Sequence, residues 1–268
     1  MLHIGTSGWQ YRDWRGRFYP ADRPARAWLD YYAATFTTVE VNSAFYRLPA
    51  ADTFRGWAEQ TPPDFIVAVK ASRYLTHIRR LLDPVEPVAR FLDRAAGLGG
   101  KLGPVLLQLP PTLPVEVERL DETLAQFPAG IRVAVEPRHR SWWTDEVRQV
   151  LTAHRAALCW ADRDGRPVTP LWATADFGYL RLHAGRATPR PSYGRGAIDG
   201  WLGRLADTYP SGQDVFVYFN NDHAAAAVAN AATMSDRAVR RGQPVATRNA
   251  HAGGADQRVA AAGHGGHR

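Results

Sequence analysis

Four side chains that can hold or transfer a proton stand at or near the ends of short apolar segments: Glu40, Lys70, Glu136 and His183. Glu136 follows Val133-Ala-Val135 and precedes Pro137, so its carboxylate should face a cleft. A carboxylate in such a place acts as a general acid or base, or as a metal ligand. We predict that Glu136 is the acid/base residue, helped by His183 and Glu40. A structural ion pair with Arg138 or Arg181 is the alternative for Glu136.

Lys70 ends the apolar run 65–69. An ammonium group is costly to bury unless it is paired, so this placement favours a phosphate-binding or electrophilic role, or less commonly a Schiff base. A lysine reaching out to the rim is the alternative. Two carboxylates with a histidine would also suit a divalent metal, so the metal requirement stays open. Gly5-Thr-Ser-Gly8 is neither a dinucleotide fingerprint nor a phosphate loop, and no nucleotide cofactor is predicted.

A larger set of polar and aromatic residues stands just beyond the same apolar segments. We predict that they bind the substrate: Trp9, Asn42, Tyr46, His77, Gln108, Arg138, Arg181, Asn220, Asn221 and Asp222. One of residues 220–222 should cap the following helix. Because a polar or charged group closes nearly every apolar segment, the pattern predicts a ligand site.

The elements that position these residues alternate between strand and helix. Strands are expected at 2–6, 38–41, 65–69, 105–109, 132–136, 157–160, 178–183 and 215–219. Helices are expected at 25–34, 53–60, 85–96, 115–126, 144–154, 198–208 and 223–232, with little helical pattern in 162–176. Eight such units predict an α/β fold with a single TIM (β/α)₈ barrel, whose site lies at the C-terminal ends of the strands.

Composition limits the class of protein. The chain of 268 residues is 45% hydrophobic, and no apolar run is long enough to cross a bilayer. No signal peptide is visible, so we expect a cytoplasmic protein without a membrane partner. The single cysteine, Cys159, lies in an apolar stretch that is typical of a buried thiol.

The C-terminal stretch differs in composition from the rest. We expect a barrel domain at 1–234 and a disordered tail rich in Arg, Gly and Ala at 235–268. Part of the net charge of +7 lies in that tail, which weakens an argument for nucleic-acid binding from charge alone.

Motifs spread along the chain carry a family resemblance: Gly5-Thr-Ser-Gly-Trp9, Glu40-Val-Asn42 with Phe45-Tyr46, Gln108-Leu-Pro-Pro111, Glu136-Pro-Arg138, Arg181-Leu-His183 and Tyr218-Phe-Asn-Asn-Asp222. The chain resembles the YecE-like family of uncharacterised proteins, known as domain of unknown function 72. The resemblance implies a TIM barrel and no particular reaction. Two departures are Ala184 between His183 and Gly185, and the tail in place of the family's C-terminal helix.

Three functions fit these residues. The first is a hydrolase or lyase that uses acid/base chemistry on a small anionic or sugar-like, polyhydroxylated substrate. The second is a nuclease-like barrel that processes nucleic acid, with arginines on phosphates and tryptophans on bases. The third is a non-catalytic protein that binds a metabolite in the mouth of the barrel, because a fold does not determine a function. The oligomeric state cannot be read from the sequence.

Overall fold

The strands lie in two five-stranded sheets in the computed structural model, which describes residues 1–210 and 212–248. The first sheet has the order β1 (Leu2–Thr6), β10 (Asp214–Phe219), β9 (Phe177–Leu182), β7 (Trp160–Arg163) and β8 (Arg166–Pro167). The second has the order β2 (Thr38–Val41), β3 (Ile66–Lys70), β4 (Leu102–Gln108), β5 (Val133–Glu136) and β6 (Ala157–Leu158). Every paired neighbour is parallel except β7 and β8. The α/β class is confirmed.

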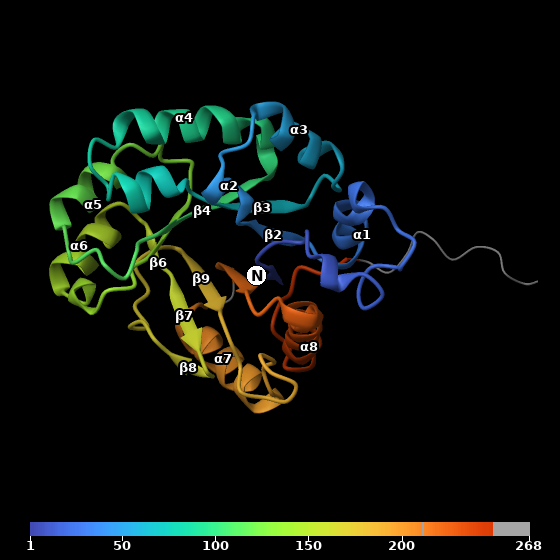
Figure 1. The fold of residues 1–268 in the computed structure, drawn as a ribbon. Coiled ribbons are helices and arrows are strands. Elements are labelled where there is room, and N and C mark those ends of the chain that lie inside the picture. Colours follow the sequence, from blue (N-terminus) through green and yellow to red (C-terminus); the bar gives the residue numbers. More distant parts are fainter. Residues whose placement is uncertain (211, 249–268) are drawn as a thin grey trace, which may run out of the picture.

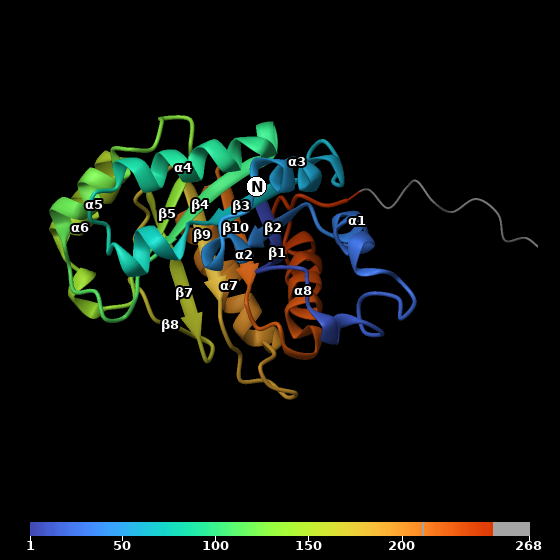
Figure 2. The ribbon, with the colours of Figure 1, turned by 45° about the horizontal axis from the view of Figure 1, so that its top comes forward.

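Helices are arranged around the strands (Figures 1 and 2). The α-helices are α1 (Trp28–Thr35), α2 (Ser43–Tyr46), α3 (Ala51–Glu59), α4 (Val85–Ala95), α5 (Val117–Leu124), α6 (Asp145–Ala153), α7 (Arg195–Thr208) and α8 (Ala226–Arg240). Short 3₁₀ turns lie at Arg12–Trp14, Ala25–Ala27, Ala96–Lys101, Arg140–Trp142 and His223–Ala225, and a π-helix lies at Tyr74–Ile78. None of the helices in the described ranges is both long and apolar enough to cross a membrane.

The two sheets approach each other at both of their margins. On one side, a single bridge joins Ser7, just after β1, to Glu40 near the end of β2. On the other side, only Cys159 separates β6 from β7, and its backbone N–H donates to the carbonyl of Val135 at 2.8 Å. The C-terminal ends of the strands in both sheets therefore face a common region.

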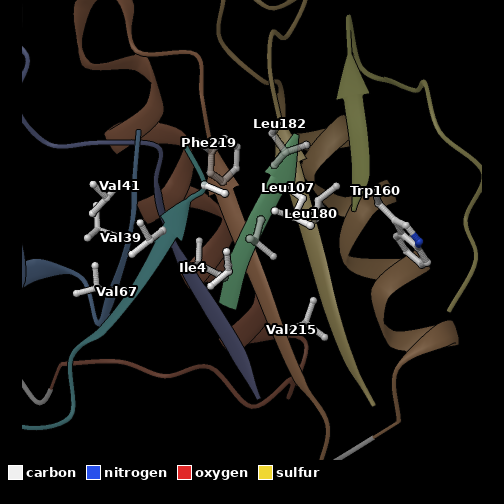
Figure 3. Packing of buried hydrophobic residues seen from close by; sticks show 14 of the residues in the cluster. Ile4, Val39, Val41, Val67, Leu107, Trp160, Leu180, Leu182, Val215 and Phe219 are labelled. Carbon is white, nitrogen blue, oxygen red and sulfur yellow. The ribbon is translucent and has the colours of Figure 1, made fainter. Parts of the chain in front are cut away.

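Alternating side chains along each strand divide the apolar residues into two clusters. One set, including Ile4, Val39, Leu107 and Leu180, belongs to the larger cluster, which also contains residues from the helices (Figure 3). The other set forms a separate buried cluster of Ala68, Leu106, Ala134, Ala157, Cys159, Phe177, Tyr179, Phe216 and Tyr218. Because side chains alternate along a strand, the residues two positions after members of this second cluster lie on the same face, beyond it. These positions hold Lys70, Gln108, Glu136 and Arg181.

Two segments differ in form from the sequence-based expectations. Part of the stretch 162–176, which lacked a helical pattern, forms the antiparallel hairpin of β7 and β8. The predicted domain boundary at Met234 falls inside α8, which continues to Arg240 and buries Ala238 completely. Beyond the helix, Leu2 pairs with Val245 in an isolated bridge. The expected disorder is therefore wrong for residues 235–248, and residues 249–268 lie outside the described part.

The alanine-rich composition explains why the boundary was misplaced. The buried residues of α8 include Ala227, Ala231 and Ala238, and the larger Met234. Such small side chains can pack closely against a strand, but they produce little contrast in hydrophobicity along the sequence. A helix of this kind is easily mistaken for a low-complexity segment.

Candidate active site

Glu136 lies at the end of β5 with 1% of its surface exposed, and it accepts hydrogen bonds at both carboxylate oxygens. Oε2 accepts from Arg181 and from the Gln108 amide, each at 2.7 Å. Oε1 accepts from His183 Nε2 at 2.9 Å and, at 3.4 Å, from Arg138. Burial alone raises the pKa of Glu136, but Arg181 and His183 outweigh it and hold that pKa well below its ordinary value. The carboxylate is therefore ionised and fully engaged, which suits an orienting role better than the predicted acid role.

Arg181 joins the two buried carboxylates of the site. It follows Tyr179 on the inward face of β9, and its second guanidinium nitrogen donates to Glu40 Oε1 at 2.8 Å. Glu40 is completely buried and also accepts from Ser7 Oγ at 2.7 Å and from Tyr179 at 2.6 Å. The ion pair between Glu136 and Arg181 that the sequence allowed is present, and it extends to Glu40.

Lys70 is the second cation of the cluster. Its Nζ donates to Gln108 Oε1 at 2.8 Å and lies 3.8 Å from the centre of the Phe45 ring. Gln108 thus bridges Lys70 to Glu136. Burial, followed by the charge of Arg181, lowers the pKa of Lys70 to about 8. The amine is therefore poised to lose its proton slightly above neutral pH, as expected for a group at a functional site.

His183 is held at both ring nitrogens. Nδ1 lies 3.1 Å from the Asn220 amide nitrogen, which donates to it, and Nε2 lies 2.9 Å from Glu136. Because Nδ1 accepts, the Nε2 proton points to Glu136. A carboxylate in this position fixes the tautomer of an imidazole and stabilises the ring when it becomes charged.

Glu136 and His183 also line a cavity of ≈ 340 Å³. The remaining walls come from β7 itself and from residues after β4, β5 and β8: Pro111, Pro137, Arg138, Arg140, Trp143, Ala161, Arg163, Val168 and Thr169. Arg138 leaves 33% of its side chain exposed, and its one ion pair within residues 1–210 and 212–248 is a 3.4 Å contact with Glu136. Its guanidinium therefore retains donors for an anionic ligand.

Three of the predicted substrate-binding residues form no hydrogen bond with the charged cluster among residues 1–210 and 212–248. Trp9 is buried against the edge of Trp57, so it belongs to the core. The Asn221 amide donates to the carbonyl of Pro191 and to Asn230, which ties the segment before α7 to α8. Tyr46 lies on α2, is 78% exposed, and packs its ring edge-on against Phe45 at 5.1 Å between ring centres.

Three other predicted residues lie at neighbouring strand ends without joining the cluster directly. Asn42 follows β2, and its buried side-chain oxygen has no hydrogen-bond partner among residues 1–210 and 212–248. His77 packs edge-on against Phe45, and burial together with the charge of Lys70 lowers its pKa to about 4. Burial raises the pKa of Asp222 to about 6 despite a hydrogen bond to Tyr11.

Two residues of the cluster were missed by reasoning from the sequence. Tyr179 precedes Arg181 by two positions, so the alternation of a strand would have placed it on the same face. The ring of Phe45 lies against the ammonium group of Lys70, and nothing in the local sequence indicates that contact. The described residues contain no group of three or more His, Cys, Asp and Glu side chains arranged to hold a metal.

Comparison with known proteins places these observations in a family. YecE of Escherichia coli K12, described as a UPF0759 protein, is 31% identical over 172 residues, which cover 63% of this chain and 61% of that relative. The crystal structure of a DUF72 family protein from Thermotoga maritima is 26% identical with a TM-score of 0.76, covering 88% of this chain and 98% of the other.

A more distant structure shares the fold alone. SacUVDE has 7% sequence identity and a TM-score of 0.56, with 91% of this chain and 99% of that chain covered. The match to the family model is far broader than any single motif, because it runs from residue 3 to residue 253. The chain therefore belongs to the DUF72 family, whose members are described as proteins of unknown function.

Proposed function

We propose that this protein is an enzyme, a hydrolase or lyase, which uses acid/base chemistry on an anionic or polyhydroxylated substrate. We further propose that the two sheets form the wall of one TIM barrel, with the substrate bound at the C-terminal ends of the strands. The observation that carries the proposal is the Glu136–His183 pair at the wall of the ≈ 340 Å³ cavity. Concave sites with convergent polar groups and perturbed pKa values are typical of active sites.

His183 takes the role of proton-transfer group in this proposal. Glu136 keeps the proton on Nε2. The lone pair of Nδ1 therefore accepts a proton from the substrate, once the hydrogen bond from the Asn220 amide to Nδ1 is broken. The resulting imidazolium is stabilised by the buried carboxylate. Arg138 and Arg140 line the same cavity and would bind the anionic end of the substrate.

Lys70 supplies positive charge behind this pair. Through Gln108 it contacts Glu136, and its pKa of about 8 makes that charge dependent on pH near neutrality. Lys70 and Arg181 would stabilise negative charge that develops on the substrate in the transition state, because the site holds little water.

A substrate screen with a matched pair of histidine variants tests the proposal. We would assay wild-type protein, His183→Asn and His154→Asn against phosphate esters, glycosides and sugar lactones. His154 lies at the end of α6, paired with Asp121 on the surface. We expect turnover to fall roughly 10²–10⁴-fold in His183→Asn and to stay unchanged in His154→Asn. Equal turnover in all three proteins would contradict the role of His183.

A nuclease-like function is the second candidate, favoured by one observation. Arg138, Arg140 and Arg163 line the cavity together with Trp143, and guanidinium groups with an indole suit phosphates and a base. Binding of single-stranded DNA that weakens steeply with salt and is reduced in an Arg140→Ala, Arg163→Ala variant would support it. No binding at low salt would reject it.

A ligand that binds the cavity and is recovered unaltered would instead support a non-catalytic metabolite-binding protein.

A further inference from the structure

A second cavity, of ≈ 1010 Å³, is lined by residues that follow β2 and β3 and by residues of α4. Its walls come from α2, the segment leading into α3, the residues just after β3, and α4. Three arginines line it, namely Arg47, Arg90 and Arg94. The hydroxyl-bearing residues Ser43, Thr53, Ser72 and Tyr74 line it as well, and no carboxylate does. The cavity, which we call the arginine cleft, is therefore positively charged and rich in hydrogen-bond donors.

The arginines of the cleft are only weakly neutralised. Arg47 forms no ion pair within residues 1–210 and 212–248. Arg90 lies 3.4 Å from Glu86, one turn earlier on the same helix, and Arg94 lies 3.8 Å from its neighbour Asp93. Both carboxylates are largely exposed, at 66% and 79% of the side chain. Exposed pairs of this kind contribute little, so the guanidinium groups remain available to a ligand.

The cleft adjoins the charged cluster through the chain. Ser43 directly follows Asn42 beyond β2, and Ser72 stands two residues after Lys70. The short helix α2 contributes Ser43 to the cleft and, two residues later, Phe45 to the contact with Lys70. A ligand in the cleft therefore lies near the C-terminal ends of β2 and β3.

We propose that the arginine cleft binds the phosphate groups of a small molecule that carries a chain of two or three phosphates. Arginine matches a phosphate with two parallel hydrogen bonds, and serine and threonine hydroxyls complete such a shell. The size of the cleft and its three arginines exceed what a single phosphate needs. This inference goes beyond the proposed reaction, because it does not require Glu136 or His183.

Calorimetric titration with inorganic tripolyphosphate at constant ionic strength tests the proposal. The variants would be Arg47→Ala with Arg94→Ala together, the control Arg55→Ala, Arg138→Ala in the ≈ 340 Å³ cavity, and Glu136→Gln. Arg55 lies on α3, pairs with Asp52 at 3.0 Å and does not line the cleft. We expect the affinity to fall roughly 10- to 100-fold in the double variant and to be unchanged in the control and in Glu136→Gln. Circular dichroism would verify that each variant is folded.

Three outcomes would overturn the proposal. The first is an absence of tripolyphosphate binding by the wild-type protein. The second is an equal loss of affinity in Arg55→Ala and in the double variant, which would mean that net charge alone attracts the anion. The third is a loss of binding in Arg138→Ala with none in the double variant, which would locate the anion in the ≈ 340 Å³ cavity instead. Because tripolyphosphate binding is measured without turnover, failure of the acid/base reaction in the substrate screen is distinguished from failure of the cleft.

Discussion

Arg181 holds the buried charges of the site together. It is 1% exposed and donates to Glu40 and to Glu136 through different nitrogens, while Lys70 reaches the same network through Gln108. Two carboxylates and two cations thus share a region that excludes water. Buried charges are tolerated when they are paired, and removing one partner leaves the other uncompensated.

Replacing Arg181 with methionine should therefore destabilise the fold strongly. We expect the free energy of unfolding at pH 7 to fall by roughly 3–5 kcal/mol, because the buried Glu40 and Glu136 lose their shared cationic partner. Urea denaturation measures the change, and Arg195→Met, at an exposed position on α7, is the matched control. A loss in Arg181→Met no larger than in the control would show that the network adds nothing to stability.

The titration of Lys70 gives a test at the same scale. The chain contains only two lysines, Lys70 and Lys101, so a protein with ¹³C-labelled lysine side chains yields two signals. We expect one signal with a midpoint at a pH of about 8, and it should disappear in Lys70→Met. A titration midpoint of the Lys70 signal at a pH of about 10.4, the ordinary pKa of lysine, would contradict the burial of a charged amine.

The same shift has a consequence for stability. The pKa of Lys70 is lower in the folded chain than in the unfolded chain, so between these two values the unfolded chain binds more protons. The contribution of Lys70 to the free energy of unfolding should therefore rise as the pH increases from about 8 to about 10.4. The difference between wild type and Lys70→Met, measured across that window, isolates this contribution.

At the scale of elements, the seam between β1 and β2 brings the two sheets together. Gly5 lies in β1, and a Cβ atom at this position would lie 2.3 Å from the carbonyl oxygen of Thr38 on β2. The backbones can approach this closely only because Gly5 has no side chain. The seam also positions Ser7 against Glu40 at the end of the strands.

Gly5→Ala should force β1 and β2 apart. We expect a loss of roughly 2 kcal/mol or more in unfolding free energy, because the clash is with backbone rather than with a flexible side chain. Gly100→Ala is the control, since a Cβ there meets nothing within 4 Å. Thermal denaturation of both variants makes the comparison, and a Gly5→Ala protein as stable as Gly100→Ala would mean that the seam yields without cost.

At the scale of the whole molecule, the C-terminal segment returns to the start of the chain. The N–H of Leu2 donates to the carbonyl of Pro244 at 2.7 Å, and the N–H of Ala246 donates to the carbonyl of Leu2 at 2.9 Å. Residues after Met234 are therefore part of the fold that holds β1 in place, and β1 in turn carries Ser7 to the site.

A pair of alanine substitutions on α8 tests this arrangement. Ala238 is completely buried and Ala229 is exposed on the same helix. Ala238→Glu should lower the unfolding free energy by about 3 kcal/mol or more, because it buries an unpaired charge, whereas Ala229→Glu should change it little. Equal stability of the two variants would indicate that the helix beyond Met234 does not pack against the rest.

The sequence by itself determined the alternation of strands and helices and, to within one or two residues, the positions where the eight predicted strands end. Hydrophobic runs with turn residues between them mark the elements, and the ends of parallel strands must gather at one edge. For that reason Glu40, Lys70, Gln108, Glu136, Arg181 and His183 could be selected as site residues. The family motifs contained the same residues.

Only the tertiary structure decided how those residues are paired. Whether Glu136 is a free acid or the orienting partner of His183 depends on contacts from β4 and β9, which are far away in the sequence. The burial of Trp9, the contact of Phe45 with Lys70 and the arginine cleft arise in the same way, from elements packing across the molecule. Local patterns predict which side of an element is buried, but the distance between two side chains depends on the packing of the whole fold.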